Sequence, residues 1–464
     1  MKKRRIKVKL SQCMIVKNEE KNIRRALSWG RGIVSEQIVV DTGSTDRTVE
    51  IAKEMGAKVY HFKWVDDFSA AKNYAIKQAE GNWIAFLDAD EYFSEESAKK
   101  LIPVIERAEE LSSEGRKIYA IRSNLANVND NGKLGVLIQQ DRIFRNDPGL
   151  RYQNRIHEGL RLSGSRAYGF IDAREELLIL HSGYTWETYE QTGKLERNIH
   201  MLEEDLKDDP ESVSALAYLG DAYLSQKRFE KAKECFRKAA DYGLKKGEEE
   251  TGTTLRCIIM LLILYAQESD TEQESIVREL HGQYLKLYGG HPDGDCYFGA
   301  WLYQTGRYTE AEKYLRSALE KMRVYRANLP LYMTSELKVF YVQLADCCRR
   351  QGKKNDAVRY LVIALGVDKY YTEPLVMLLN LLKGEQGEAE TASGTWNILS
   401  QLYDVSALKD QMTILKGAKL TVFAALEKRV FDAMPEDQRR AVQEALYKKA
   451  EEIKAHAKSP EKAD

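Results

Sequence analysis

The 464-residue sequence has no excess of charge of either sign. Its 71 lysine and arginine residues are balanced by 71 aspartate and glutamate residues, so the formal net charge is zero. Proteins that long-range electrostatics steer towards nucleic acid or an anionic membrane surface carry an excess of positive charge. The composition therefore argues against a nucleic-acid partner, and any charged partner must be recognised by a local patch.

Cysteine motifs and long apolar runs are also missing. The six cysteines form no Cys-x-x-Cys pair and no Cys/His metal spacing, which excludes a zinc site or a disulfide framework encoded in the spacing. The basic segment 1–10 lacks the apolar centre of a secretory signal. The longest apolar run, 257–266, is far shorter than the roughly 20 residues that cross a bilayer. We expect a cytoplasmic protein without a membrane span, in which 257–266 is a buried helix.

The first part of the chain alternates short apolar stretches with amphipathic ones. This alternation is typical of a parallel sheet with crossover helices, an open α/β fold. The predicted strands are 11–16, 37–41, 58–61 and 83–88, and the predicted helices are 21–29, 46–55 and 69–79. Beyond residue 114 the pattern predicts further strands at 117–125, 135–144 and 168–181, which we expect to shape the acceptor side.

After about residue 190 the strand pattern gives way to helical repeats. A template of small and large residues recurs at 218–239, 297–318 and 345–364, and Gly220 of the first copy corresponds to Gly299 of the second. Because small residues let two helices approach closely, each copy predicts a helix hairpin that stacks on its neighbour, similar to tetratricopeptide repeats. The chain is also longer than chains that usually fold around a single hydrophobic core. We expect an α/β domain at 1–190, helical repeats at 191–390, and C-terminal helices with a disordered tail at 391–464.

Two acidic clusters follow predicted strands. The segment 41–46 reads Asp-Thr-Gly-Ser-Thr-Asp, and 88–91 reads Asp-Ala-Asp-Glu. Ligands of open parallel sheets bind beyond the carboxyl ends of the strands, so both clusters are expected at one edge. Clustered carboxylates repel a bare diphosphate unless a divalent cation lies between them, and oxygen ligands select Mg²⁺ or Mn²⁺. The alternative for such a short motif is a helix cap with solvated acids.

Glycine-rich phosphate loops are absent, since the chain has neither Gly-x-Gly-x-x-Gly nor a Walker loop. Four ordered motifs, at 11–20, 38–46, 67–73 and 86–91, instead resemble family 2 glycosyltransferases of the GT-A (Rossmann-like) fold. The resemblance covers about residues 11–184. The fused tetratricopeptide-like helices narrow it to a bacterial branch that includes the sublancin S-glycosyltransferase, which modifies a cysteine of a peptide.

The resemblance implies a donor site at these motifs. It places Ile15, Lys17, Asp41 and Thr42 around the nucleobase and ribose of a UDP-sugar, although family members often carry a second aspartate where this chain has Thr42. Lys72, at a position often taken by arginine, would approach the nucleotide or its phosphates, and its alternative is an ordinary exposed lysine. In the Asp-x-Asp segment, Asp88 would contact ribose or metal, Ala89 would line the nucleotide site, and Asp90 would be the chief metal ligand and a catalytic residue.

Two later segments resemble further motifs of this branch. An inverting transferase needs a carboxylate that takes the acceptor proton, and Glu158 is the candidate general base. The family's usual acidic pair is replaced here by His157 and Glu158. His181, directly after the apolar run 177–180, is a candidate third metal ligand, with a purely hydrogen-bonded histidine as the alternative.

These observations predict a cytoplasmic enzyme that moves a hexose from a UDP-sugar to a peptide or protein. The acceptor atom is a cysteine sulfur or a Ser/Thr oxygen, and a thiol needs less help from a base because its pKa is near 8.5. The repeats would grip the acceptor, with Trp301, Tyr303, Tyr308 and Tyr314 as possible contacts beside core roles, or would form a homodimer. The alternatives are a non-catalytic scaffold with a degenerate transferase domain and a sugar-nucleotide nucleotidyltransferase.

Overall fold

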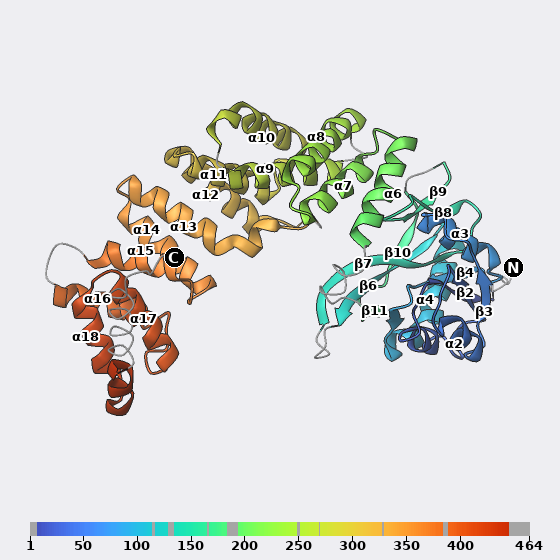
Figure 1. The fold of residues 1–464 in the computed structure, drawn as a ribbon, viewed down its shortest axis with the longest axis horizontal. Helices are drawn as coiled ribbons and strands as arrows, with labels where there is room; N and C mark the ends of the chain where they lie inside the picture. Colours follow the sequence, from blue (N-terminus) through green and yellow to red (C-terminus); the bar gives the residue numbers. More distant parts are fainter. Residues whose placement is uncertain are drawn as a thin grey trace, which may run out of the picture. The chain divides into compact units, whose positions relative to one another are not determined.

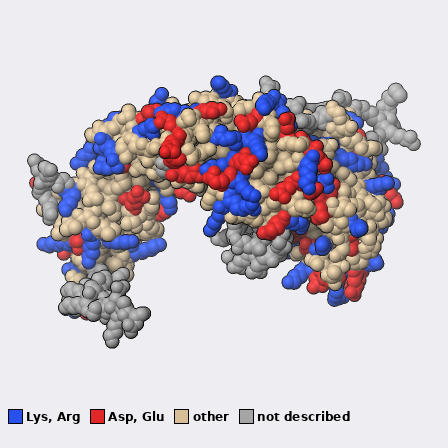
Figure 2. Space-filling view, turned by 45° about the horizontal axis from the view of Figure 1, so that its top comes forward, with Lys and Arg blue, Asp and Glu red and all other residues tan. Residues whose placement is uncertain are grey.

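The computed structural model describes residues 7–113, 117–128, 134–164, 167–182, 194–247, 251–268, 270–326, 329–383 and 388–444 (Figure 1). The chain divides into two compact units, Met1–Ala232 and Lys233–Asp464. Acidic and basic side chains are interleaved over the face drawn in Figure 2, as the balanced composition leads one to expect.

The first unit is built on a mixed sheet in the order β3-β2-β1-β4-β7-β6-β11-β5. Its first four strands are parallel, as the sequence predicts, and comprise β1 (Leu10–Val16), β2 (Glu36–Asp41), β3 (Lys58–His61) and β4 (Trp83–Phe86). The predicted crossover helices are present as α1 (Ile23–Ser28), α2 (Thr48–Glu54) and α3 (Phe68–Gln78). Strand β4 ends before Asp88, so the Asp-x-Asp segment lies in a turn beyond the sheet edge.

The second half of the sheet does not continue the parallel pairing of the first four strands. Strand β7 (Leu134–Arg145) runs antiparallel to β4 and to β6 (Ala120–Val128). The predicted strand 168–181 is two short strands, β10 (Phe170–Asp172) and β11 (Leu178–His181), which both pair with β6. Strand β5 (Glu91–Phe93), helix α4 (Glu95–Ser113) and the hairpin of β8 (Leu150–Gln153) and β9 (Gly159–Leu162) are additional elements that the sequence analysis missed.

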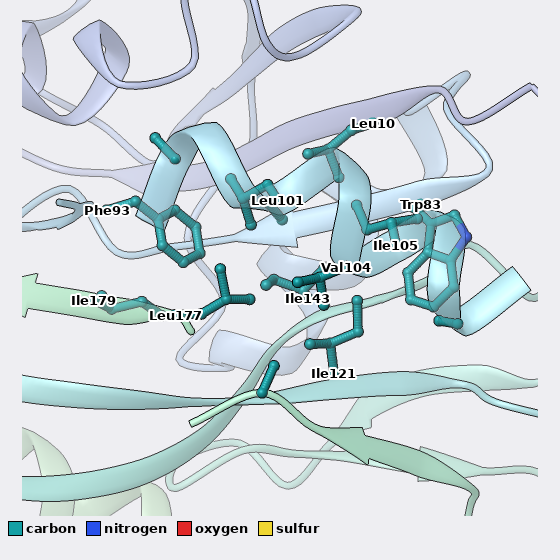
Figure 3. Packing of buried hydrophobic residues seen from close by; sticks show 14 of the residues in the cluster. Leu10, Trp83, Phe93, Leu101, Val104, Ile105, Ile121, Ile143, Leu177 and Ile179 are labelled. Carbon is teal, nitrogen blue, oxygen red and sulfur yellow. The ribbon is translucent and has the colours of Figure 1, made fainter. Parts of the chain in front are cut away.

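Helix α4 covers one face of this sheet with apolar side chains. Leu101, Val104 and Ile105 of α4 are fully buried against strand residues such as Ile121 and Ile143 (Figure 3). The spacing 101, 104, 105 and 108 is that of a single helix face, so the amphipathic pattern explains the packing. The same cluster includes Trp83 and Ala85 of β4, the strand that precedes the Asp-x-Asp segment.

The first unit also contains helices from the repeat region. Helices α6 (Lys194–Asp208) and α7 (Val213–Ser225) pack together within it, and α8 (Phe229–Lys246) begins there. The compact unit therefore extends past residue 190. The domain limits expected from the sequence stay a prediction.

The second unit is helical throughout its described residues. Its α-helices are α9 (Thr251–Glu268), α10 (Glu274–Tyr288), α11 (Pro292–Gln304), α12 (Tyr308–Val324), α13 (Leu337–Arg350), α14 (Lys354–Val367), α15 (Thr372–Lys383), α16 (Glu388–Leu399), α17 (Leu408–Leu420) and α18 (Ala424–Ala433). The hairpins α11–α12 and α13–α14 coincide with the second and third copies of the repeat template. Residues 445–464, the end of the predicted region 391–464 of C-terminal helices and disordered tail, lie outside the described residues.

The close approach of two helices explains why one position of the repeat template is a small residue. A β-carbon on Gly299 would lie 3.0 Å from Leu315 Cγ and 3.1 Å from its backbone nitrogen, so α11 and α12 touch through this glycine. Trp301 is fully buried, and the expected acceptor contact Tyr303 donates to Asp346 at 3.1 Å. These two aromatics serve internal packing.

The apolar run 257–266 lies within α9 and is buried, as predicted. Among the helices that the structure describes, none combines the length and the hydropathy that a membrane crossing requires.

Candidate active site

The loops after β1 and β2 meet at the carboxyl edge of the sheet. Asp41, the last residue of β2, is 5% exposed, and its carboxylate accepts hydrogen bonds from the backbone nitrogens of Ser44 at 2.9 Å and Gly43 at 3.3 Å. Burial alone raises the pKa of Asp41, but the hydrogen bonds from Ser44 and from His61 outweigh it and lower the pKa. Asp41 is therefore a buried anion facing this edge.

The neighbouring residues of the expected nucleoside pocket differ in their accessibility. Thr42 is buried, and both its backbone nitrogen and its hydroxyl donate to the carbonyl of Val16, at 2.9 and 3.0 Å. Lys17 is exposed and Ile15 is half-buried. Asn18 has a φ of 58° and accepts from Thr45 N at 2.8 Å, so it ties the two loops together.

Lys72 is at the centre of the site. It is 2% exposed, and its Nζ lies 2.6 Å from Glu158 Oε1 and 3.2 Å from Asp88 Oδ1. The ammonium also lies 5.2 Å from the ring centroids of Phe86 and Tyr152. Burial opposes the charged form of Lys72, but the charges of Asp88 and Glu158 outweigh it and raise the pKa of the lysine. The structure thus joins three of the predicted residues through one buried cation.

A second cation, Arg142 on β7, holds the other side of Asp88. Its guanidinium lies 2.8 Å from Asp88 Oδ2 and 2.6 Å from Glu91 Oε1. Burial raises the pKa of Glu91, whereas Arg142 and Lys72 overcome burial at Asp88 and lower its pKa. Both oxygens of Asp88 are therefore occupied by cationic side chains.

Asp90 and His181 form a separate pair at the same edge. His181 Nε2 lies 3.1 Å from Asp90 Oδ2, and its Nδ1 lies 2.7 Å from Asn127 Oδ1. With Nδ1 donating to Asn127, Nε2 donates to Asp90, and this hydrogen bond raises the pKa of His181. A divalent cation would replace the hydrogen on Nε2, and the bond to Asn127 would then orient the ring as in a metal-ligating histidine. The pair therefore fits a divalent cation, with the remaining ligands coming from the diphosphate and water. Asp90 also lies next to Ala89, which is buried.

In the described parts of the chain, one group of three potential ligands has donor atoms within 4.8 Å of one another: Glu312, Cys348 and Asp356. Arg316 contacts all three side chains, lying 2.8 Å from Glu312 Oε1 and 2.7 Å from Asp356 Oδ2. A guanidinium already neutralises this cluster, so it is an ion-pair network in the second unit. Asp88, Asp90 and His181 do not converge to that degree.

Residues 11–172 match the family described as glycosyl transferase family 2. This segment is a family 2 glycosyltransferase domain. Tetratricopeptide repeats match at 213–242 and 297–324, which confirms the first two copies of the repeat template.

Two named relatives are similar to part of this chain. The chain is 33% identical over 268 residues to a tetratricopeptide-repeat-containing protein of Synechococcus elongatus, covering 57% of this chain and 63% of the relative. It is 30% identical over 210 residues to the glycosyltransferase SunS of Bacillus subtilis, covering 45% and 47%. The chain thus spans between about half and two thirds of these relatives' length. Among solved structures, S. aureus TarS 1–349 in complex with UDP-GlcNAc aligns at 18% identity and a TM-score of 0.33, covering 68% of this chain and 93% of TarS 1–349.

In the transferase domain, the loop that carries Glu158 is held from the repeat side. Arg155 pairs with Asp205 at 3.2 Å and with Asp208 at 2.8 Å, both on α6. The ring of His157 stacks on Tyr218 of α7 with centroids 3.7 Å apart and planes 11° apart. All these residues belong to the first unit. The hairpin α6–α7 therefore forms one wall around the candidate base loop of the transferase domain.

The backbone of the same loop is held from the other side by α3. Ser69 Oγ donates to the carbonyl of Asn154 at 2.6 Å, and Phe68 N donates to that of Arg155 at 2.8 Å. Asn154 and His157 adopt φ values of 75° and 53°, in the left-handed region that costs a non-glycine residue energy. Contacts on two sides offset that cost and fix where Glu158 points.

The sequence analysis missed Arg142, Tyr152 and Asn127. Arg142 lies within the predicted strand 135–144, between Asp141 and Ile143, and an arginine inside a predicted strand was a usable signal for a buried ion pair. Asn127 contacts His181 only because β6 and β11 pair at that point, with His181 opposite Asn127. No local sequence pattern predicts such a partner.

Proposed function

We propose that this chain is a cytoplasmic glycosyltransferase that moves a hexose from a UDP-sugar to a cysteine or Ser/Thr side chain of a peptide or protein, with inversion and with a divalent metal. The transferase domain supports the reaction class, and the resemblance of its motifs supports the donor. The observation that carries the proposal is the meeting of Lys72, Asp88 and Glu158 beside the Asp90–His181 pair at one sheet edge.

The donor would lie across this edge. Asp41, Thr42, Ile15 and Lys17 line the side proposed for the nucleoside, and Lys72 brings positive charge towards the phosphates. Asp90 and His181 would hold Mg²⁺ or Mn²⁺, which as a Lewis acid would stabilise the departing diphosphate.

Glu158 is the proposed general base. The acceptor sulfur or oxygen forms a bond to the anomeric carbon while the bond from that carbon to the UDP oxygen breaks, and UDP leaves with the electron pair. The acceptor proton moves to the Glu158 carboxylate. Lys72 orients that carboxylate at 2.6 Å and is itself buried against aromatic rings, so the base has one defined position.

The test is to incubate the full chain with a panel of UDP-sugars and Mn²⁺, with and without candidate peptides, and to read peptide mass shifts and UDP release. Hexose addition to a peptide, lost in Glu158→Gln, supports the proposal. Metal-dependent UDP binding without UDP release from any sugar would favour the non-catalytic scaffold. Formation of UTP and a sugar 1-phosphate when pyrophosphate is added would favour a nucleotidyltransferase.

A further inference from the structure

A cavity lies far along the sequence from the transferase domain, between α15 and α17. It has a volume of about 520 Å³ and is lined mainly by α17, with Tyr370, Thr372 and Leu375 on the other side. Leu375 and Leu415 are buried and form its floor, whereas Met412 and Leu420 stay exposed at 36% and 57%. An open apolar hollow of this kind on a helix pair marks a binding surface.

Charge around the hollow has one sign. Its lining includes Lys409, Lys416 and Lys419 and no aspartate or glutamate. Lys409 lies over the ring of Tyr370 at 3.8 Å, and none of the three ammonium groups forms an ion pair among the described residues. Asp410, next to Lys409 in the chain, is 2% exposed and is already paired with Lys369 at 2.6 Å. The rim therefore carries three lysines that form no ion pair with the described residues, around an apolar floor.

We propose that this surface, defined by Tyr370, Lys409, Met412, Lys416, Lys419 and Leu420, binds an acidic polypeptide segment that inserts an apolar side chain. Its volume suits one or two large side chains, and carboxylates beside them would meet the lysines. The chain's own segment 445–464 carries five lysines against four acidic residues, so it does not complement the rim. The proposed binding does not depend on sugar transfer, and the bound segment need not belong to the acceptor.

The packing beneath the surface makes it a rigid site. A β-carbon on Gly417 would lie 2.9 Å from Leu375 Cδ2, so α15 and α17 are in close contact there. Tyr370 OH donates to Asp410 at 2.8 Å, which ties the loop before α15 to α17. The rim lysines are thus presented on fixed backbone.

The experiment uses the full chain and a fluorescein-labelled peptide in which two leucines are flanked by four glutamates in a Gly/Ser background, followed by fluorescence anisotropy. Binding is expected to weaken at least about tenfold, equivalent to about 1.4 kcal/mol, in a variant that combines Lys416→Glu with Lys419→Glu. The same loss is expected in a separate variant, Leu420→Ser. Lys428→Glu on α18, exposed but outside the lining, is the matched control and should bind as the parent does.

Peptides in which glutamine replaces glutamate, or serine replaces leucine, should also lose affinity. Equal binding by the double variant and Lys428→Glu overturns the proposal, as does the absence of binding by the parent chain. A shift of the parent's sedimentation towards a dimer that only the double variant abolishes, without peptide binding, would assign the surface to self-association instead. Binding to phosphatidylglycerol vesicles alone would likewise overturn it.

Discussion

At the scale of single residues, Lys72 contributes both to the stability of the fold and to the proposed reaction. One buried ammonium neutralises two carboxylates that come from different parts of the chain, Asp88 and Glu158. Removing one partner of a buried ion pair leaves the other charges uncompensated, which costs more than the pair itself contributes. Function and stability are therefore expected to change together at this position.

Replacing Lys72 with methionine should lower the free energy of unfolding by about 3 kcal/mol, the usual cost of a broken buried pair. It should also abolish sugar transfer, because Glu158 loses the contact that orients it. Urea unfolding followed by circular dichroism measures the first effect and UDP release the second. Lys77→Met, on the exposed face of the same helix, is the control and should change neither. An active Lys72→Met enzyme would contradict the site.

The Asp90–His181 pair gives a separate prediction about the metal. Asp90→Ala should reduce Mn²⁺-dependent UDP binding at least about tenfold while leaving the fold intact, because Asp90 is partly exposed and one oxygen ligand contributes of order 1 kcal/mol or more to such a site. Titration calorimetry with and without a chelator measures this. Binding of UDP that ignores both the chelator and the substitution would exclude the proposed metal site.

At the scale of elements, the hairpin α6–α7 serves the transferase domain. Tyr218 stacks on His157, the residue before Glu158, and α6 pairs with Arg155 of the same loop. Tyr218→Ala should lower kcat by about tenfold to a hundredfold with little change in the KM for the donor, because a misplaced catalytic group affects the chemical step. Tyr218→Phe keeps the ring and should restore kcat. Equal kcat in both variants would show that the stack does not position the base.

The start of α11 in the second unit contains two buried groups whose titrations oppose each other. Burial lowers the pKa of His291 to about 4 and raises the pKa of Asp293 to about 6. Below about pH 6.5 the unfolded chain protonates His291 while the folded chain does not, so stability falls as the pH falls. For Asp293 the folded chain holds the proton between about pH 3.9 and 6, so stability falls as the pH rises. The two effects nearly cancel in the parent chain.

Substitution of either group should leave the free energy of unfolding with the pH dependence that the remaining group causes. Asp293→Asn should lose on the order of 2 kcal/mol between pH 6.5 and pH 4.5, because only the His291 effect remains. His291→Asn, which keeps a helix-capping side chain, should instead lose stability as the pH rises over the same range. Urea midpoints at the two pH values measure both slopes, and parallel behaviour of the two variants would contradict the assignment.

At the scale of the whole molecule, the first compact unit reaches residue 232, beyond the 11–172 match of the transferase family. A fragment ending at residue 190 would lack α6 and α7 and therefore the partners of Arg155 and His157. It should melt several degrees below a fragment ending at residue 232, since each 1 kcal/mol shifts the melting temperature of a domain of this size by about 2–4 °C. Equal melting temperatures would place the functional boundary near residue 190.

The sequence by itself determined the fold class and the position of the acidic segments at the ends of strands. The alternation of apolar stretches predicted the four parallel strands β1 to β4. Strands β1 and β4 are buried on both faces, as strands inside a parallel sheet are, whereas β3 lies at the edge and is partly exposed. The small residues of the repeat predicted the hairpins, and the acidic segments were predicted at strand ends where the structure has them.

Only the tertiary structure decided how these residues are paired. The antiparallel strand β7 brings Arg142 to Asp88, and the pairing of β6 with β11 brings Asn127 to His181. The pairing of Asp88 with Arg142, and of Asp90 with His181, follows from contacts between residues more than 50 positions apart. Local patterns constrain neighbours in the chain, whereas the partners of a buried charge are set by whichever strands the whole sheet places side by side.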